Sequence, residues 1–420
     1  MKTIAIIGLG NRGSLYARHL KKHGAKIVAL CEKNPELLKN VQKKCDVPEE
    51  NCFTSDVEFF TKGRLADGIV IATQDRDHYG HCLSAIDLGY DILCEKPVSP
   101  IYEQCVEIDR KVKEKGVLMM VCHVLRYSKY FDKIKQIIDS GVIGDVVGVT
   151  QIENVGYWHF AHSYVRGNWR REDETGPSIL AKCCHDLDMI YYLTQKNAIS
   201  VASTGSRKVF LPENKPEDSP KYCLDGCPHA KTCPYHVSKI YLKPTRYTLP
   251  LMIVNKRLIT QKGNASMKDF KEALKTSPYG RCVYDCDNDV IENQTVQLKL
   301  EDGVNATLTM TAFSNMSYRH TRISGTKGEI LGNDISGKFK VNVFAGKRKK
   351  VKFGLSNLLS HLGGDIEMCK EFIELLETKK PSKRASLMSE TMESHVNAFA
   401  AEESRKTGKT IDIAEFLEQQ

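Results

Sequence analysis

Residues 1–122 alternate between short, mainly apolar runs and longer stretches in which apolar residues recur at helical spacing. Such runs are typical of strands buried on both faces, and amphipathic stretches such as 14–22 and 101–115 are typical of covering helices. The pattern predicts an α/β domain with a doubly wound parallel sheet, whose ligand crevice lies at the carboxyl ends of the strands. The apolar runs lie at residues 1–7, 25–31, 68–73, 91–95 and 117–121.

Beyond residue 122 the periodicity changes. Alternation of polar and apolar residues is typical of a sheet with one buried face, so residues 123–420 are predicted to form an α+β domain with an open, mainly antiparallel sheet. Helical spacing marks residues 366–376 and 389–407. Residues 211–290, rich in Pro, Lys and Cys, interrupt the pattern and are interpreted as an insertion. The alternating segments are residues 146–153, 294–300, 306–312 and 318–324.

A glycine-rich loop, residues 8–13, follows the first strand directly and opens a helix. In a G-x-G-x-x-G loop the first glycine permits the turn, the second lets the backbone approach a pyrophosphate, and the third allows close helix packing. Glu32 ends the second strand, about 20 residues further on, where a carboxylate accepts hydrogen bonds from ribose hydroxyls. Together these features predict a dinucleotide-binding Rossmann domain. The alternative for Glu32 is an ordinary surface carboxylate.

Glu95-Lys96-Pro97 follows another parallel strand, which places Lys96 beside the nicotinamide end of a bound dinucleotide. A lysine there could hydrogen-bond a substrate hydroxyl and relay its proton while hydride leaves the same carbon. Pro97 would fix the turn, and a cis bond before it is one way to do so. The alternative is a surface lysine after a strand.

Composition narrows the class of protein. The net charge of +9 comes from basic helix faces and a basic run at residues 347–352, without the aromatic interleaving of a nucleic-acid module. No apolar run approaches the roughly 18 residues of a membrane span, and no signal peptide is recognised. Fifteen cysteines in such a chain indicate reduced thiols or metal ligands and predict a cytoplasmic protein.

The insertion gathers cysteines in a segment that lacks a core of its own. We expect thiolates to order it around a structural Zn²⁺, with an iron–sulfur cluster or free buried thiols as the alternatives. His229 and His236 could substitute as ligands. The predicted ligands are Cys223, Cys227, Cys233 and Cys282, with Cys286 as the alternative.

Both tryptophans of the chain lie within residues 157–170, beside Arg, Asn and His residues. Aromatic rings cover the C–H face of a sugar and polar forks bind its hydroxyls or a carboxylate, so the segment predicts a sugar site. The alternative is a loop that stacks its own aromatics. The predicted substrate contacts are Arg166, Asn168, Trp169 and Arg170, with Arg126 and Tyr127 after the strand predicted at 117–121.

The glycine fingerprint, Glu95-Lys96-Pro97 and Cys184-His185-Asp186-Leu187-Asp188 resemble the Gfo/Idh/MocA oxidoreductase family, named for glucose–fructose oxidoreductase and inositol dehydrogenase. Residues 394–405 are similar to its closing helix. The resemblance implies a C-terminal sheet that makes oligomer contacts, hence a homodimer or homotetramer, and His185 as a catalytic histidine with Lys96. The positions that match its NAD-binding residues are Gly8, Gly10, Asn11, Arg12, Gly13, Glu32, Thr73, Gln74, His78, Glu95 and Lys96.

One position departs from the family pattern. Family dehydrogenases usually carry a substrate-binding Asp four residues before the histidine, and here that position is Ala181, followed by Lys182. The carboxylate is therefore missing or supplied from elsewhere. Lys182 could point into the site, which would suit an acidic sugar or another proton relay, or it could be solvated.

These features predict a cytoplasmic, NAD-dependent oxidoreductase that acts on a CH–OH group of a sugar, polyol or sugar derivative. NAD is favoured over NADP because the Glu32 carboxylate would repel a 2′-phosphate. The first alternative is a redox-neutral glycoside hydrolase or epimerase that oxidises its substrate transiently. The second is a non-catalytic NAD or redox sensor.

Overall fold

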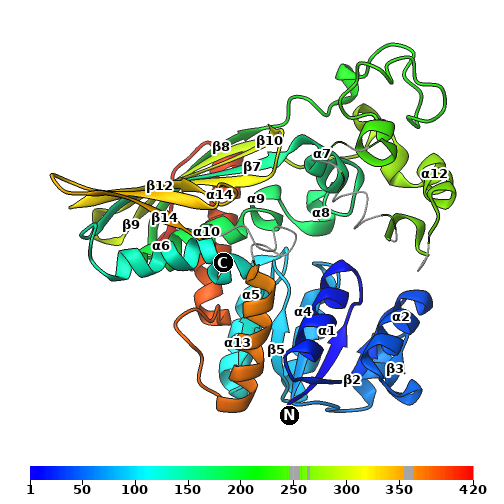
Figure 1. Ribbon diagram of the computed structural model, residues 1–420, viewed down its shortest axis with the longest axis horizontal. Coiled ribbons are helices and arrows are strands. Elements are labelled where there is room, and N and C mark those ends of the chain that lie inside the picture. Colours follow the sequence, from blue (N-terminus) through cyan, green and yellow to red (C-terminus); the bar gives the residue numbers. More distant parts are fainter. Residues whose placement is uncertain are drawn as a thin grey trace.

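The structure is a computed structural model (Figure 1) that describes residues 1–243, 245, 249, 256, 258–262, 265–353 and 363–419. The predicted insertion at 211–290 therefore falls partly outside the described residues. Figure 1 shows two separate sheets, the N-terminal one in blue and cyan and the larger C-terminal one mainly in yellow and green. Within the part of the chain that is described, no helix has the length and apolar character needed to cross a membrane.

The N-terminal sheet is parallel, with strand order β3-β2-β1-β4-β5-β6. This is the dinucleotide-binding order, and it confirms the predicted doubly wound sheet. The sequence pattern missed only β3, because two residues are too few to show a period. The strands are β1 (Thr3–Ile7), β2 (Lys26–Cys31), β3 (Cys52–Phe53), β4 (Gly68–Ile71), β5 (Asp91–Cys94) and β6 (Met119–Val121).

Helices cover both faces of this sheet, so its strands are buried on both sides. Ile4 and Ile6 of β1 pack into one core, and Ala5 and Ile7 pack into the other. The first core also takes Phe372 from α13 (Gly364–Thr378), so a late segment of the chain completes the N-terminal layer. The other helices are α1 (Asn11–Lys22), α2 (Pro35–Cys45), α3 (Asp56–Thr61), α4 (Asp77–Asp87) and α5 (Tyr102–Lys115), with a short turn η1 (Glu49–Asn51).

The C-terminal sheet has nine strands in the order β14-β13-β12-β11-β7-β10-β9-β8-β15. Among the strands that the structure describes, only β7 and β10 of this sheet pair in parallel, which confirms the predicted open, mainly antiparallel sheet. The strands are β7 (Val146–Gly156), β8 (Ala198–Ser206), β9 (Asn293–Leu300), β10 (Asn305–Ser314), β11 (Tyr318–Gly325), β12 (Gly328–Asn333), β13 (Lys338–Val343), β14 (Arg348–Lys352) and β15 (Ile411–Asp412).

One face of this sheet is buried, as the alternation in β10 shows, where Leu308 and Met310 are fully buried. The helices on the C-terminal side are η2 (Val124–Tyr127), α6 (Lys129–Asp139), α7 (Tyr157–Phe160), η3 (Ala161–Arg166), α8 (Glu172–Thr175), α9 (Ser178–Ala181), α10 (Cys184–Thr194), α14 (Met388–Thr407) and α15 (Ile413–Glu418).

The insertion leaves the sheet between β8 and β9 and is drawn in green at the upper right of Figure 1. Its described part is mostly irregular. The short elements within it are η4 (Pro212–Asn214), η5 (Ser238–Leu242), α12 (Met267–Thr276), η6 (Pro278–Gly280) and η7 (Val283–Asp285), and η8 (Glu301–Gly303) follows β9.

Candidate functional site

The glycine loop has the geometry of a phosphate-binding turn. Gly8 adopts a φ of +84°, and a Cβ there would lie 2.5 Å from the carbonyl oxygen of Ala72. A Cβ on Gly13 would lie 1.8 Å from the carbonyl oxygen of Gly8, so no larger residue fits without moving α1. A Cβ on Gly10 would meet nothing within 4 Å. The middle glycine therefore leaves open space at the N-terminus of α1, where a phosphate approaches unpaired N–H groups.

Glu32 lies beside this loop, at the end of β2. Its Oε2 accepts a hydrogen bond of 2.7 Å from the backbone N–H of Leu9, and its Oε1 accepts one of 2.9 Å from that of Asn34. The carboxylate is thus held at the edge of the glycine loop. Its predicted contact with the ribose hydroxyls stays a prediction.

Arg12 points inward, toward Glu95. Its Nε lies 2.6 Å from Glu95 Oε1 and its Nη2 lies 2.7 Å from Asp365 Oδ1, while the Tyr16 hydroxyl donates to the same Glu95 oxygen. Burial alone would raise the pKa of Glu95, but Arg12 and Tyr16 outweigh it and lower that pKa. The family resemblance predicts Arg12 at the pyrophosphate, whereas in the structure its guanidinium pairs with Glu95, next to Lys96, and with Asp365.

Lys96 reaches from the parallel sheet to the C-terminal helices. It follows β5 through a cis Lys96–Pro97 bond, and its Nζ donates a hydrogen bond of 2.6 Å to the carbonyl of Ala181. Ala181 ends α9 four residues before His185, which lies in the first turn of α10 and is 9% exposed. The fold therefore brings the amine of Lys96 to the backbone four residues before His185, at the turn between α9 and α10.

Two histidines that the sequence did not indicate, His123 and His395, lie close to His185. The ring centroid of His123 lies 5.6 Å from that of His185 and 6.2 Å from that of His395. Burial lowers the pKa of His123, to which Arg126 and Lys96 add, and burial with His123 lowers the pKa of His395 to about 3. Both rings are neutral near pH 7, so they place no positive charge beside Lys96. His123 follows β6, and its position at a strand end was the available signal.

Lys182 turns toward the sheet, and its side chain is 16% exposed. Its Nζ lies 3.1 Å from Oε1 of Glu153 on β7, and the Glu153 side chain is 1% exposed. Oε2 of the same carboxylate lies 3.1 Å from Nη2 of Arg319, which also pairs with Asp186 on α10. A buried carboxylate thus lies beneath α10, in a chain whose family Asp position is Ala181. The Gln-Ile-Glu run of β7 was the only sequence signal for it.

Three arginines that were predicted to bind substrate form hydrogen bonds and ion pairs within the protein instead. Arg126 is fully buried, donates two hydrogen bonds of 2.9 and 2.7 Å to Asp188, and pairs with Glu390 at 2.6 Å. Arg170 lies 3.1 Å from Asp287, and Arg166 donates to backbone carbonyls of the insertion. The adjacent Tyr127 is 2% exposed. Because the three arginines already have internal partners and Tyr127 is almost fully buried, we do not retain these four residues as substrate ligands.

Asn168 and Trp169 instead meet the loop that follows β4. The Asn168 amide donates to Gln74 Oε1 at 3.3 Å, and the Trp169 indole N–H donates to Asp75 Oδ2 at 2.9 Å. Burial raises the pKa of Asp75, although His78, Lys96 and this bond oppose it. The aromatic segment therefore lies on the loop predicted to cover a dinucleotide.

Thr73 and His78 hold that loop from within. The Thr73 hydroxyl contacts His81 Nδ1 at 3.1 Å. The fully buried His78 bonds through Nδ1 to the Pro97 carbonyl at 2.8 Å, and so ties the loop to the Lys96 turn.

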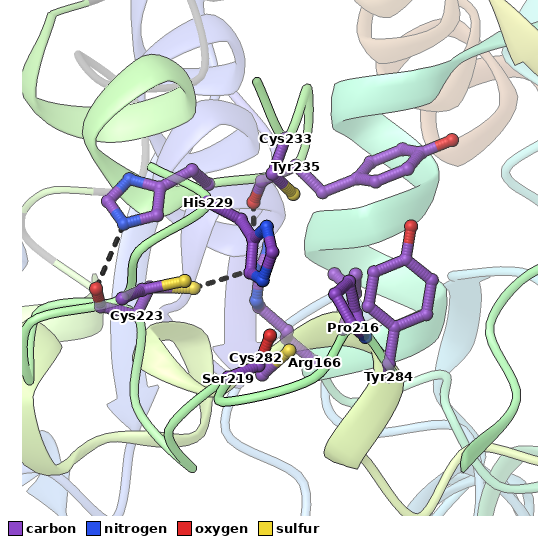
Figure 2. Close-up of a pocket in the computed structure, with 12 residues that line it drawn as sticks. Arg166, Pro216, Ser219, Cys223, His229, Cys233, Tyr235, Cys282 and Tyr284 are labelled. Carbon is purple, nitrogen blue, oxygen red and sulfur yellow. Dashed lines mark hydrogen bonds between the residues drawn. The ribbon is translucent and has the colours of Figure 1, made fainter. Parts of the chain in front are cut away.

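The cysteines of the insertion surround one small cavity (Figure 2). Cys223, Cys227, Cys233 and Cys282 line it together with Arg166, whereas Cys286 is not among its lining residues. Across the described ranges, no group of three or more His, Cys, Asp or Glu side chains is placed to hold a metal ion. The geometry by itself gives no support to zinc or to an iron–sulfur cluster.

Comparison with known proteins covers most of the chain. Residues 2–123 match the model of an oxidoreductase family, NAD-binding Rossmann fold, and residues 135–411 match the C-terminal alpha/beta domain of the same family. A relative is the 2,7-anhydro-N-acetylneuraminate hydratase of Mediterraneibacter gnavus, 28% identical over 49% of this chain and 53% of that protein. The chain spans about half the length of this and the next curated relative.

Two solved structures share the fold over almost the whole chain. An oxidoreductase from Agrobacterium radiobacter, in complex with NAD⁺, L-tartaric acid and magnesium, has a TM-score of 0.71 at 16% identity over 99% of both chains. Levoglucosan dehydrogenase, in complex with NADH and levoglucosan, has a TM-score of 0.71 at 16% identity over 98% of this chain and 99% of that one. At these identities the likeness shows the fold alone. The two matching domain models show the family: the chain belongs to the Gfo/Idh/MocA oxidoreductases.

Proposed function

We propose that the protein is an NAD-dependent dehydrogenase that oxidises a CH–OH group of a sugar, polyol or sugar derivative. The observation that carries the proposal is the bond from Lys96 Nζ to the carbonyl of Ala181, four residues before His185. It joins the strand ends beside the glycine loop to the end of α9, just before α10. The names of the relatives, which include inositol dehydrogenases, support this substrate class.

The residues present fit a dinucleotide. Gly10 leaves space for a pyrophosphate at the N-terminus of α1, and the Glu32 carboxylate stands at the edge of the same loop. A carboxylate there accepts hydrogen bonds from ribose hydroxyls and repels a 2′-phosphate, which favours NAD over NADP. When bound, the nicotinamide would supply the hydride acceptor.

Lys96 and His185 would have different roles in the proton transfer. Lys96 would hold the substrate oxygen by a hydrogen bond and stabilise the charge that develops on it. His185 would take the hydroxyl proton as general base. The neutral His123 behind it withholds a competing positive charge. The Arg12–Glu95 pair would fix the backbone from which Lys96 projects.

One observation favours a second candidate. Ala181 stands where the family Asp is usual, and the chain resembles a hydratase that acts on an anhydro sugar acid. A redox-neutral enzyme would use the same Lys96 and His185, but would return the hydride to its substrate.

Incubation with NAD and a panel of inositols, aldoses and anhydro sugars separates the two. A dehydrogenase converts substrate and NADH in equal amounts, measured by nicotinamide absorbance and product chromatography. Product without net NADH would favour the redox-neutral enzyme. Absence of both products, with NAD bound, would favour the sensor.

We further propose a homo-oligomer that forms through the C-terminal sheet, on the basis of the chain's family. Val147, Ile199 and Phe313 are exposed apolar residues near the ends of β7, β8 and β10. Light scattering of the purified chain tests it, and a monomer at micromolar concentration would contradict it.

A further inference from the structure

The insertion brings two distant cysteine segments side by side. Tyr222 and Arg281 form an antiparallel bridge, in which the N–H of Cys223 donates to Gly280 at 3.0 Å and the N–H of Cys282 donates to Lys221 at 2.8 Å. Cys223 and Cys282 therefore sit on adjacent backbones, each one residue past the bridge.

Two more cysteines close the same space. Cys227 begins a turn and Cys233 follows it, with the Cys233 N–H donating to the His229 carbonyl at 2.9 Å. All four cysteines line one cavity of about 20 Å³, and Figure 2 shows Cys223, Cys233 and Cys282 grouped beside Arg166. A cavity of this size holds a single water-sized or ion-sized occupant.

The neighbouring histidines are already engaged. Nε2 of His229 bonds to the Glu217 carbonyl at 2.8 Å, and the two ring nitrogens of His236 bond to Ser238 Oγ at 2.7 Å and the Cys223 carbonyl at 2.9 Å. The thiol of Cys286 donates outside the cavity, to the Cys282 carbonyl. The Cys223 thiol also donates to a carbonyl, that of Arg281 at 3.7 Å, but Cys223 lines the cavity and Cys286 does not, so the candidate ligands are the four lining thiols.

A second observation points to an occupant that makes these thiols anionic. Arg166, 1% exposed, lies beside the cavity with Nη2 3.7 Å from Cys223 Sγ and 2.9 Å from the Tyr235 carbonyl. Its Nη1 has no hydrogen-bond partner, and within the described ranges the ionisable groups that act on Arg166 most strongly are cysteine thiols and the Tyr241 phenol, not carboxylates. A buried cation without a counter-charge is costly, so the thiols are the groups that can balance it.

The thiols become anionic only if something displaces their protons. A thiophilic cation releases those protons and supplies the missing anionic charge on sulfur.

We infer that the cavity binds one thiophilic divalent cation of the zinc class through the thiolates of Cys223, Cys227, Cys233 and Cys282, with Arg166 as their counter-ion. Four thiols lose four protons and form four bonds to sulfur; the site carries two negative charges, of which Arg166 offsets one. The sulfurs surround the cavity without converging, so binding requires their side chains to rotate inward.

The inferred site is connected to the cofactor loop through a short segment. Arg166 ends η3 two residues before Asn168, and Asn168 and Trp169 bond to Gln74 and Asp75. An occupied site that fixes Arg166 also fixes these contacts. This second consequence rests on the proposed function, whereas the metal site does not.

Metal content of the full chain, purified without tag or chelator, tests the site. We expect about one zinc per chain, and after cobalt exchange a sulfur-to-cobalt charge-transfer band. Cys282→Ser should lower bound metal by roughly tenfold or more, while the matched Cys286→Ser keeps it. No stoichiometric metal in the wild type, a disulfide within the cluster, or equal metal in Cys282→Ser would each overturn the inference.

The affinity for NAD tests the connection separately. Removing the metal with a chelator should raise the Kd for NAD several-fold, and restoring zinc should reverse the change. An unchanged Kd with the metal removed would refute the connection and leave the metal site standing. An absence of NAD binding in either form would count against the proposed function, and the metal content would still decide the site.

Discussion

Packing requires glycine at positions 8 and 13, whereas access for a ligand requires it at position 10. A matched pair of alanine substitutions distinguishes these two requirements. Gly13→Ala places a methyl group 1.8 Å from the Gly8 carbonyl oxygen, deep inside van der Waals contact, so α1 must move away from β1. Gly10→Ala places the same methyl group in open space.

Overpacking of this kind costs about 1–3 kcal/mol. For a domain of this size each kcal/mol lowers Tm by about 2–4 °C, so Gly13→Ala should lower Tm by roughly 2–12 °C. Gly10→Ala adds a methyl group where a pyrophosphate would approach the backbone. It should keep the wild-type Tm and raise the Kd for NAD by roughly tenfold or more, equivalent to about 1.4 kcal/mol.

Differential scanning fluorimetry without ligand gives the Tm values, and isothermal titration gives the Kd for NAD. The reasoning is refuted if Gly10→Ala loses as much thermal stability as Gly13→Ala. It is equally refuted if Gly10→Ala binds NAD as tightly as the wild type does.

Three further outcomes follow from the site. Arg126→Met leaves a buried carboxylate unpaired and should cost about 3–5 kcal/mol of unfolding free energy; a stable variant with only a raised KM would restore Arg126 as a substrate ligand. The pKa of Glu95 is lowered from its ordinary 4.5, so its contribution to stability is present above that pH and lost as pH falls through the lowered value; urea unfolding should show Glu95→Gln flattening this part of the pH profile, and a profile identical to wild type would contradict it. Trp169→Phe removes the N–H that bonds to Asp75 and should cost about 1 kcal/mol in NAD binding, a rise of roughly fivefold in Kd; an unchanged Kd would show that this contact does not help to hold the cofactor loop.

The features that could be predicted from the sequence were those that depend on residues close together in the chain. The apolar runs of β1 and β4, the glycine turn and the alternation in β10 each depend on neighbours a few residues away. These are enough to specify a parallel sheet, a mainly antiparallel sheet and the place where a dinucleotide binds.

The carboxylates that pair with Arg126 could not be predicted from neighbouring residues. From the sequence, Arg126 was interpreted as a substrate-binding guanidinium at a strand end. In the structure it pairs with Asp188 on α10 and Glu390 on α14, which are far from it in the sequence. Lys182 and its partner Glu153 likewise come from different elements, joined only when the sheet forms. Residue type and spacing indicate that such a charged group either takes part in the reaction or forms an internal ion pair. Only the folded structure shows which of the two roles it has.

The most direct test of the account is the turnover of Lys96→Met, with the exposed Lys33→Met as its matched control. Initial rates of NADH formation on the best substrate of the panel, together with the Kd for NAD, would be measured for both variants and the wild type. We expect Lys96→Met to lose roughly 10²–10⁴-fold in kcat, with little change in its Kd for NAD, and Lys33→Met to keep the wild-type rate. Wild-type turnover in Lys96→Met would remove Lys96 from the mechanism and contradict the proposed site.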